Sequence, residues 1–153
     1  MKRVKVVGIG NPLLTDEGVG IHAINRLIFM DLPAGIDLVD GGTNTYDLVD
    51  VFSDSDYIII VDALKAGDEP GAIYRASLDD LGLKPSEGSV SLHEINFMEA
   101  MHMVRLQGYN PQVVVFGIEP AVIDWGLELS PTLEARMPRL LELVKAELEV
   151  VCS

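Results

Sequence analysis

The chain has 153 residues, 48% of them hydrophobic, and its 24 acidic against 11 basic residues give a formal net charge of −13. The hydrophobic content and the mean hydropathy of +0.28 exclude a disordered chain, and the length favours a single domain over residues 1–153. The charge argues against binding of nucleic acid or of anionic membranes. It is compatible with a basic protein partner, or with an acidic solvated surface that has no partner.

The features that bear on compartment indicate the cytoplasm. The longest apolar runs are strand-sized, well short of the ~20 residues that span a bilayer. The first residues, Met1–Val4, lead directly into a predicted strand without the apolar region of a signal peptide. The lone Cys152 forbids an internal disulfide and fits a reducing compartment. We therefore expect a soluble, cytoplasmic protein.

Strands and helices alternate along the first half of the chain. Apolar runs rich in β-branched residues predict buried strands, and apolar residues at helical spacing predict the helices between them. The predicted elements are a strand over Arg3–Ile9, a helix from Asp16 or Glu17 to about Met30, a strand over Ile36–Asp40, a helix over Tyr46–Phe52 and a strand over Tyr57–Asp62.

The second half of the chain completes an α/β domain. The run Ala72–Ala76 follows the third strand too closely for a helical crossover, so we expect an antiparallel edge strand. The remaining predicted elements are a loop over residues 78–88, a helix over Ser91–Leu106 with a capping box of Ser91 and Glu94, a strand over Val113–Gly117, and a final helix from Ser130-Pro131 that Pro138 kinks or starts later. The pattern predicts a three-layer αβα sandwich around a five-stranded, mostly parallel sheet with one antiparallel edge strand.

Acidic residues follow three of the predicted strands. Asp62 closes the apolar run of the third strand, Asp40 closes the second, and Asp16 with Glu17 follows the first. The carboxyl ends of parallel strands meet at one edge of the sheet, where α/β proteins bind their ligands. A bare carboxylate is not stable inside such a sheet without a partner, so these side chains should emerge at that edge. The pattern predicts a metal site or an acid/base site there.

Each of these acids also has a purely structural interpretation. Asp16 and Glu17 are favourable charges at a helix N-terminus, worth about 0.3–1 kcal/mol each. Asp40 before Gly41-Gly42 is typical of a turn. Asp62 can accept hydrogen bonds from loop amides beyond the strand. The buried approach to Asp62 favours a functional role for that residue.

The glycine-rich start of this region does not fit a dinucleotide-binding site. Gly8-Ile9-Gly10 begins the pattern, but Leu13 stands where a third glycine is required. Carboxylates at the start of the next helix would also repel a phosphate. Gly18 and Gly20, which weaken a helix, instead indicate close approach of the helix to the sheet or to another chain.

One of the three histidines is placed to join the acidic edge. His93 lies at a predicted loop-to-helix start, where a side chain can reach a crevice. Phe97 occupies the position at which a helical zinc-protease motif needs its second histidine, and His22 and His102 lie on other helix faces. Carboxylates with one imidazole suit divalent nickel, zinc or copper. Three such ligands leave open positions, so the site could share a metal that arrives on another molecule.

Six segments form a series that covers essentially the whole chain. They are Gly8–Gly20, Asp40–Thr43, Val61–Ala63, Leu92–Glu94, Gly117–Pro120 and Gly126–Pro131. In this order they resemble the signatures of the maturation endopeptidases of nickel–iron hydrogenases. The acid before Gly18 is Asp in some members of that family and Glu here, which preserves the charge.

This resemblance implies an endopeptidase that removes a short C-terminal extension from the hydrogenase large-subunit precursor after nickel has been inserted. It also implies the five-stranded sheet with helices on both faces. It assigns metal binding to Glu17, Asp62 and His93, with Asp40 as a further catalytic candidate and Asp16 beside the ligands. The nickel is expected to come with the precursor, so that no permanently bound metal is needed.

The sequence leaves the mechanism and one rival function open. Nickel, or a water that it activates, supplies Lewis-acid assistance in one mechanism. In the other, a carboxylate is the general base and nickel reports only that insertion has occurred. A nickel-binding chaperone or checkpoint protein that binds the precursor without cutting it would need the same ligands. A spore-type endopeptidase and a small-molecule-binding α/β domain are further alternatives.

Overall fold

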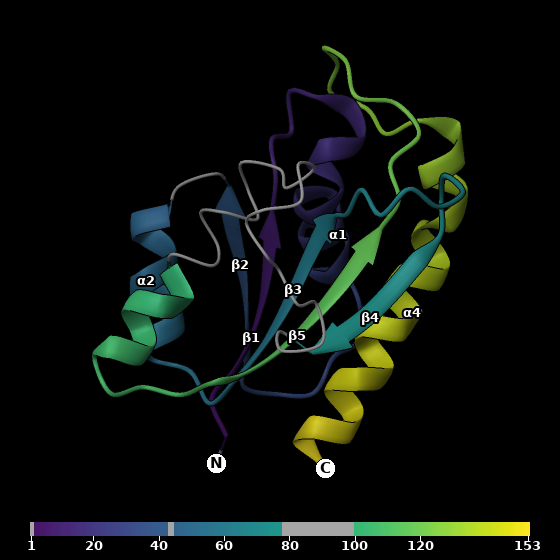
Figure 1. The fold of residues 1–153 in the computed structure, drawn as a ribbon. Helices are drawn as coiled ribbons and strands as arrows, with labels where there is room; N and C mark the ends of the chain where they lie inside the picture. The colour runs from purple at the N-terminus through teal and green to yellow at the C-terminus, as the bar shows by residue number, and fades with distance from the viewer. Residues whose placement is uncertain (1, 43–44, 78–99) are drawn as a thin grey trace.

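Five strands form one twisted sheet (Figure 1) in the computed structural model, which describes residues 2–42, 45–77 and 100–153. The strands are β1 (Val4–Ile9), β2 (Ile36–Gly42), β3 (Tyr57–Ala63), β4 (Ile73–Ser77) and β5 (Gln112–Ile118). Their spatial order is β2-β1-β3-β5-β4. The first four run parallel, and β4 lies antiparallel against β5 at the edge. The predicted mostly parallel sheet with an antiparallel edge strand is confirmed.

The central strands are buried on both faces. Every residue of β3 from Tyr57 to Asp62 is buried, as expected for an apolar run that helices cover on both sides. Alternate side chains enter two separate cores, because successive residues of a strand point to opposite faces. Ile59 and Val61 belong to one core, and Ile58 and Ile60 to the other.

Helices cover both faces of the sheet (Figure 1), which completes the predicted three-layer arrangement. α1 (Val19–Leu27) and α4 (Pro131–Cys152) pack on one face. α2 (Thr45–Ser53) and a helical segment over residues 100–106 pack on the other. The beginning of the helix predicted over Ser91–Leu106 and the loop predicted over 78–88 lie outside the described residues. No helix in the described ranges is long and apolar enough to cross a membrane.

The first helix is shorter than predicted at both ends. Thr15–Gly18 form a 3-10 turn, η1, and α1 begins only at Val19. Thr15, the first residue of this turn, has a φ of 48°, which lies outside the α-helical region. At the other end the helix stops at Leu27, whose carbonyl accepts a hydrogen bond from Met30 N at 3.0 Å. This three-residue spacing tightens the last turn and ends the α-helix.

Glycine lets α1 lie against the sheet backbone. A Cβ on Gly20 would lie 2.3 Å from the carbonyl oxygen of Val61 and 2.5 Å from that of Ile9. A Cβ on Gly8 would lie 2.2 Å from the carbonyl oxygen of Gly20. No side chain fits into either contact, so the predicted close approach of the helix to the sheet is confirmed at Gly20.

The last helix begins where the sequence predicts. The Ser130 hydroxyl accepts a hydrogen bond from Leu133 N at 3.3 Å, and Pro131 takes the first helical position. The helix continues through Pro138 as one element, so the later start considered from the sequence is wrong. The cap before this proline and fully buried side chains on both sides of it, including Met137, hold the helix together.

A polar cluster joins β3, β4 and α4. Tyr57 Oη donates to Glu147 Oε1 at 2.8 Å, and Arg75 Nη2 donates to the same oxygen at 2.6 Å. Burial, and then the hydrogen bond with Glu147, raises the pKa of Tyr57 to about 12. Burial opposes ionisation of Glu147, but the hydrogen bonds from Arg75 and Tyr57 outweigh it and lower the pKa of this carboxyl group.

Candidate functional site

The candidate site lies at the carboxyl ends of the parallel strands. The loop after β1 leads into η1, and the segment between β5 and α4 rises beyond the strand ends beside it (Figure 1). Of the predicted site residues, Glu17 lies in η1, Asp62 is the next-to-last residue of β3, and Asp40 lies near the end of β2. All three therefore lie at the predicted edge of the sheet.

The backbone of Glu17 and the carboxylate of Asp62 both lie next to Gly10. A Cβ on Gly10 would lie 2.0 Å from the carbonyl oxygen of Glu17 and 3.7 Å from Asp62 Oδ1. Gly10 has a φ of 140°, which favours glycine, and η1 contacts β3 directly. The glycine after β1 is thus the spacer that brings the turn carrying Glu17 against the strand that carries Asp62.

The two acids differ in burial. Asp62 is 9% exposed, and its Oδ1 accepts a hydrogen bond from Ala63 N at 2.8 Å. Glu17 is half-buried and stands just before α1, near the positive end of the helix dipole. A carboxylate near the surface and one held inside the rim together offer oxygen ligands to a divalent cation.

Asp40 is separated from Asp62 by the pleat of the sheet. Asp40 and Val61 both pair with Gly8 of β1, so Asp40 shares the α1 face with Val61, whereas the next residue, Asp62, points to the other face. Asp40 is exposed, and its Oδ1 accepts a hydrogen bond from Gly42 N at 3.0 Å. This contact is the turn chemistry considered for Asp40 from the sequence, and a catalytic role for it stays a prediction.

The imidazole predicted for the site, His93, lies outside the described residues. Within the part of the chain that the structure describes, no three His, Cys, Asp or Glu side chains gather closely enough to hold a metal ion. His102 is exposed on the segment over 100–106, and His22 is half-buried in α1. The predicted ligand set of Glu17, Asp62 and His93 therefore stays a prediction, with its two carboxylates on the same edge of the sheet.

Asp16, beside Glu17, has a role that the sequence did not reveal. It is fully buried, and its carboxylate accepts hydrogen bonds from Ala121 N and Val122 N at 2.8 Å each. It also accepts from Ser130 N at 2.7 Å and from Ser130 Oγ at 2.8 Å. Asp16 thus ties η1 to the segment between β5 and α4, and through Ser130 to the N-cap of α4.

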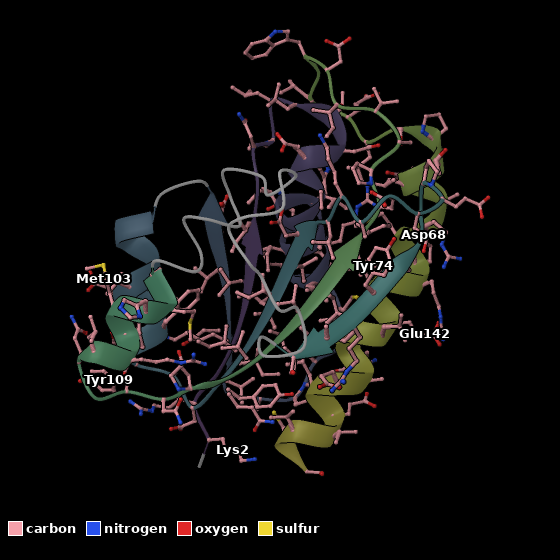
Figure 2. All side chains as sticks on the ribbon, viewed as in Figure 1. Lys2, Asp68, Tyr74, Met103, Tyr109 and Glu142 are labelled. Carbon is pink, nitrogen blue, oxygen red and sulfur yellow. The ribbon has the colours of Figure 1, made fainter. Side chains whose placement is uncertain are left out.

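Glu119 holds the loop that follows β3. It is 5% exposed, and its Oε1 accepts hydrogen bonds from Ala66 N at 3.0 Å and from Asp68 N at 2.7 Å. Tyr74 Oη contacts the same oxygen at 3.4 Å, and Figure 2 shows Asp68 and Tyr74 near each other on the β4 side of the sheet. The loops after β1, β3 and β5 are therefore all fixed by buried carboxylates or by glycine contacts.

The sequence is similar to known proteins of hydrogenase maturation. The family model described as HycI, hydrogenase maturation protease, matches residues 21–147. The hydrogenase expression/formation protein HupD of Rhodobacter capsulatus is 32% identical over 139 residues. That alignment covers 89% of this chain and 66% of HupD, so the chain spans about two thirds of that relative. The hydrogenase 2 maturation protease of Escherichia coli K12 is 28% identical over 148 residues, which cover 95% of this chain and 90% of the relative.

Solved structures share the fold. The hydrogenase-maturating endopeptidase HybD of Escherichia coli superposes with a TM-score of 0.88 at 28% identity, covering 97% of this chain and 93% of HybD. The hydrogenase maturation protease HybD of Thermococcus kodakarensis has the same fold, with a TM-score of 0.80 at 23% identity over 95% of this chain and 99% of its own. The chain belongs to the hydrogenase maturation protease family, a family of peptide-bond hydrolases.

Proposed function

We propose that this protein is an endopeptidase that removes the C-terminal extension of a nickel–iron hydrogenase large-subunit precursor once the precursor carries nickel. The observation that carries the proposal is the placement of η1, which carries Glu17, against β3, which carries Asp62, at the carboxyl edge of the sheet. Membership of the protease family supplies the class of reaction. The lone Cys152 accords with action in the reducing cytoplasm.

In this proposal the nickel is part of the substrate. Glu17 and Asp62, with the imidazole of His93, complete its coordination and hold the scissile peptide beside it. A precursor without nickel lacks this anchor, so the same residues distinguish finished from unfinished precursor. The chemistry consumes one water, whose oxygen bonds to the scissile carbonyl carbon while the C–N bond breaks and the amine leaves with a proton.

Two routes for activating the water fit this arrangement. Nickel polarises the scissile carbonyl or lowers the pKa of a bound water in the first. In the second, Glu17 accepts the proton of the water as general base, and nickel only positions the precursor. Glu17 is the better placed of the two acids for this role, because it is only half-buried and so more accessible to a water than Asp62, which is 9% exposed.

The test is mass spectrometry of a large-subunit precursor incubated with this protein, in nickel-loaded and nickel-free form. We expect loss of a C-terminal peptide from the nickel-loaded precursor only. Cleavage of both forms would contradict nickel recognition and leave a peptidase that uses its carboxylates alone. An intact precursor that nevertheless binds this protein would favour the nickel-binding chaperone over the endopeptidase.

A further inference from the structure

An apolar ridge stands beside the candidate site. It consists of residues 12–15 and 121–128 and is called the crest here. Trp125 is 78% exposed and Leu127 67%, the highest exposures among the large apolar side chains of these two segments. The other exposed apolar residues of the crest are Leu13, Val122 and Ile123. An exposed apolar patch of this kind marks an interaction site more often than a neutral surface.

Backbone hydrogen bonds hold the crest in one conformation. Thr15 N donates to Gly126 O, and Gly126 N donates to Leu13 O, both at 2.9 Å. Thr15 Oγ1 donates to Val122 O at 2.7 Å and accepts from Asp124 N at 3.1 Å. The buried carboxylate of Asp16 adds two more hydrogen bonds, which it accepts from Ala121 N and Val122 N. The apolar side chains are thus presented by an ordered backbone, which lowers the entropy cost of binding a partner.

The crest is continuous with the proposed cleavage site. Glu17 follows Thr15 by two residues, within the same 3-10 turn. An open groove of about 590 Å³ runs along the crest and is lined by Thr15, Val122, Gly126 and Leu127 together with the start of α4. A partner that fills this groove contacts Thr15, the first residue of the turn that carries Glu17.

The acidic side chains in and beside the crest indicate which kind of surface would bind it. Residues 10–18 and 119–128 contain five acidic residues and no lysine or arginine. Asp16 and Glu119 are buried, which leaves Asp124 and Glu128 exposed and Glu17 half-buried around the apolar side chains. Lys65 borders the crest beside Ala121 and Ile123. The complementary surface is therefore an apolar pocket with basic residues opposite Asp124 and Glu128.

We propose that the crest is the surface on which the folded body of the protein substrate docks, with Trp125 as the central anchor. This inference rests on the proposed function, because its occupant is the precursor that this protein cleaves. Tryptophan is enriched among the residues that dominate protein interfaces. Docking on the crest would place the C-terminal segment of the precursor near Glu17 without requiring recognition of that segment's sequence.

Steady-state cleavage of the nickel-loaded precursor tests the inference with matched variants. Trp125→Ala is expected to raise KM about thirtyfold and leave kcat within about twofold, because the residue contacts the body of the substrate and not the reacting atoms. Phe29→Ala is the control: Phe29 is 89% exposed and lies beyond the far end of α1, which runs away from the site. Its KM should stay within about twofold of wild type.

A direct binding measurement uses the fact that Trp125 is the only tryptophan. Labelling the Glu17→Gln variant with 5-fluorotryptophan gives a single fluorine resonance that reports on the crest alone. Addition of the nickel-loaded precursor should shift and broaden this resonance. An equal excess of serum albumin, the control probe, should leave it unchanged.

The outcomes separate the two claims. An unchanged KM for Trp125→Ala, with cleavage by the wild type intact, would overturn docking on the crest and leave the proposed function standing. A precursor that the wild type neither binds nor cleaves would overturn both. Sedimentation velocity should show a monomer; a wild-type dimer that Trp125→Ala dissociates would assign the crest to a second copy of the chain and overturn the inference.

Discussion

Replacement of Asp16 by alanine tests whether its carboxylate holds the site together. Four donors lose their acceptor in this variant. The amides of Ala121 and Val122 belong to exposed residues and regain water, whereas the amide and hydroxyl of Ser130 are buried. At ~1–3 kcal/mol for each buried donor left unsatisfied, the free energy of unfolding should fall by about 2–6 kcal/mol, with ~4 kcal/mol as the central value.

Urea denaturation followed by far-ultraviolet circular dichroism measures this loss. Fluorescence is a poor probe, because the only tryptophan is 78% exposed in the folded state. A loss of ~4 kcal/mol corresponds to a fall in Tm of about 8–16 °C for a chain of this length. The neighbour provides the control: Glu17→Gln removes a helix-terminal charge worth about 0.3–1 kcal/mol. If Asp16→Ala costs no more than Glu17→Gln, the reasoning is refuted.

Three further outcomes follow from the packing and the polar cluster. Gly20→Ala should destabilise by more than about 3 kcal/mol in the same assay, because its Cβ would lie 2.3 Å from Val61 O. Gly35→Ala has no atom within 4 Å of the new Cβ, so it should cost only the ~1–2 kcal/mol of an alanine at the φ of 84° found there. The pKa of Tyr57 is raised from 10.0 to about 12, so the stability that its protonated hydroxyl contributes is present below about pH 10 and is lost toward pH 12. Tyr57→Phe should remove this alkaline step when the free energy of unfolding is measured against pH. The pKa of Glu147 is lowered from 4.5, so the stability that its carboxylate contributes is present above pH 4.5 and is lost as the pH falls through the lowered pKa. Glu147→Gln should reduce this loss of stability at acid pH.

The sheet could be predicted because its signal is local. The run Tyr57–Asp62 is apolar throughout, as both faces of β3 are buried, and its composition alone identifies a central strand. The short connection before β4 identifies an antiparallel edge in the same way. Helix starts were less predictable: Asp16 and Glu17 look like the first turn of a helix, but the left-handed Thr15 and the long-range bonds of Asp16 produce a 3-10 turn instead.

The candidate site was predictable only in part. Glu17 and Asp62 lie on one edge of the sheet because each comes at or after the end of a parallel strand. The hydrophobic pattern of the sequence was sufficient to predict this placement. Asp16 could not be assigned, because its partners lie 105–114 residues further along the chain and three of its four donors are backbone amides, which carry no sequence signature. Glu119 likewise binds the amides of Ala66 and Asp68, more than fifty residues earlier.

The apolar residues of the crest could not be told from core residues by their type alone, because only the structure shows that they are exposed. Trp125 and Leu127 have the same apolar character as the residues that fill the two cores, yet they project from a loop that Asp16 fixes in place. Figure 2 shows that Met103 and Tyr109, which are also partly exposed, lie on the opposite side of the molecule, on and after the helical segment over 100–106. Among the exposed apolar side chains of the described residues, those of the crest are the ones beside η1, which carries Glu17.

Single-turnover cleavage of nickel-loaded precursor by Glu17→Gln, read by mass spectrometry, shows whether the carboxylate of Glu17 takes part in the reaction. The exchange preserves the shape of the side chain and removes the charge that both proposed mechanisms need. Release of the C-terminal peptide should slow by at least about a hundredfold, while Tm stays near the wild-type value and the precursor still binds. A rate within about threefold of wild type would contradict the assignment of the site to the edge formed by Glu17 and Asp62.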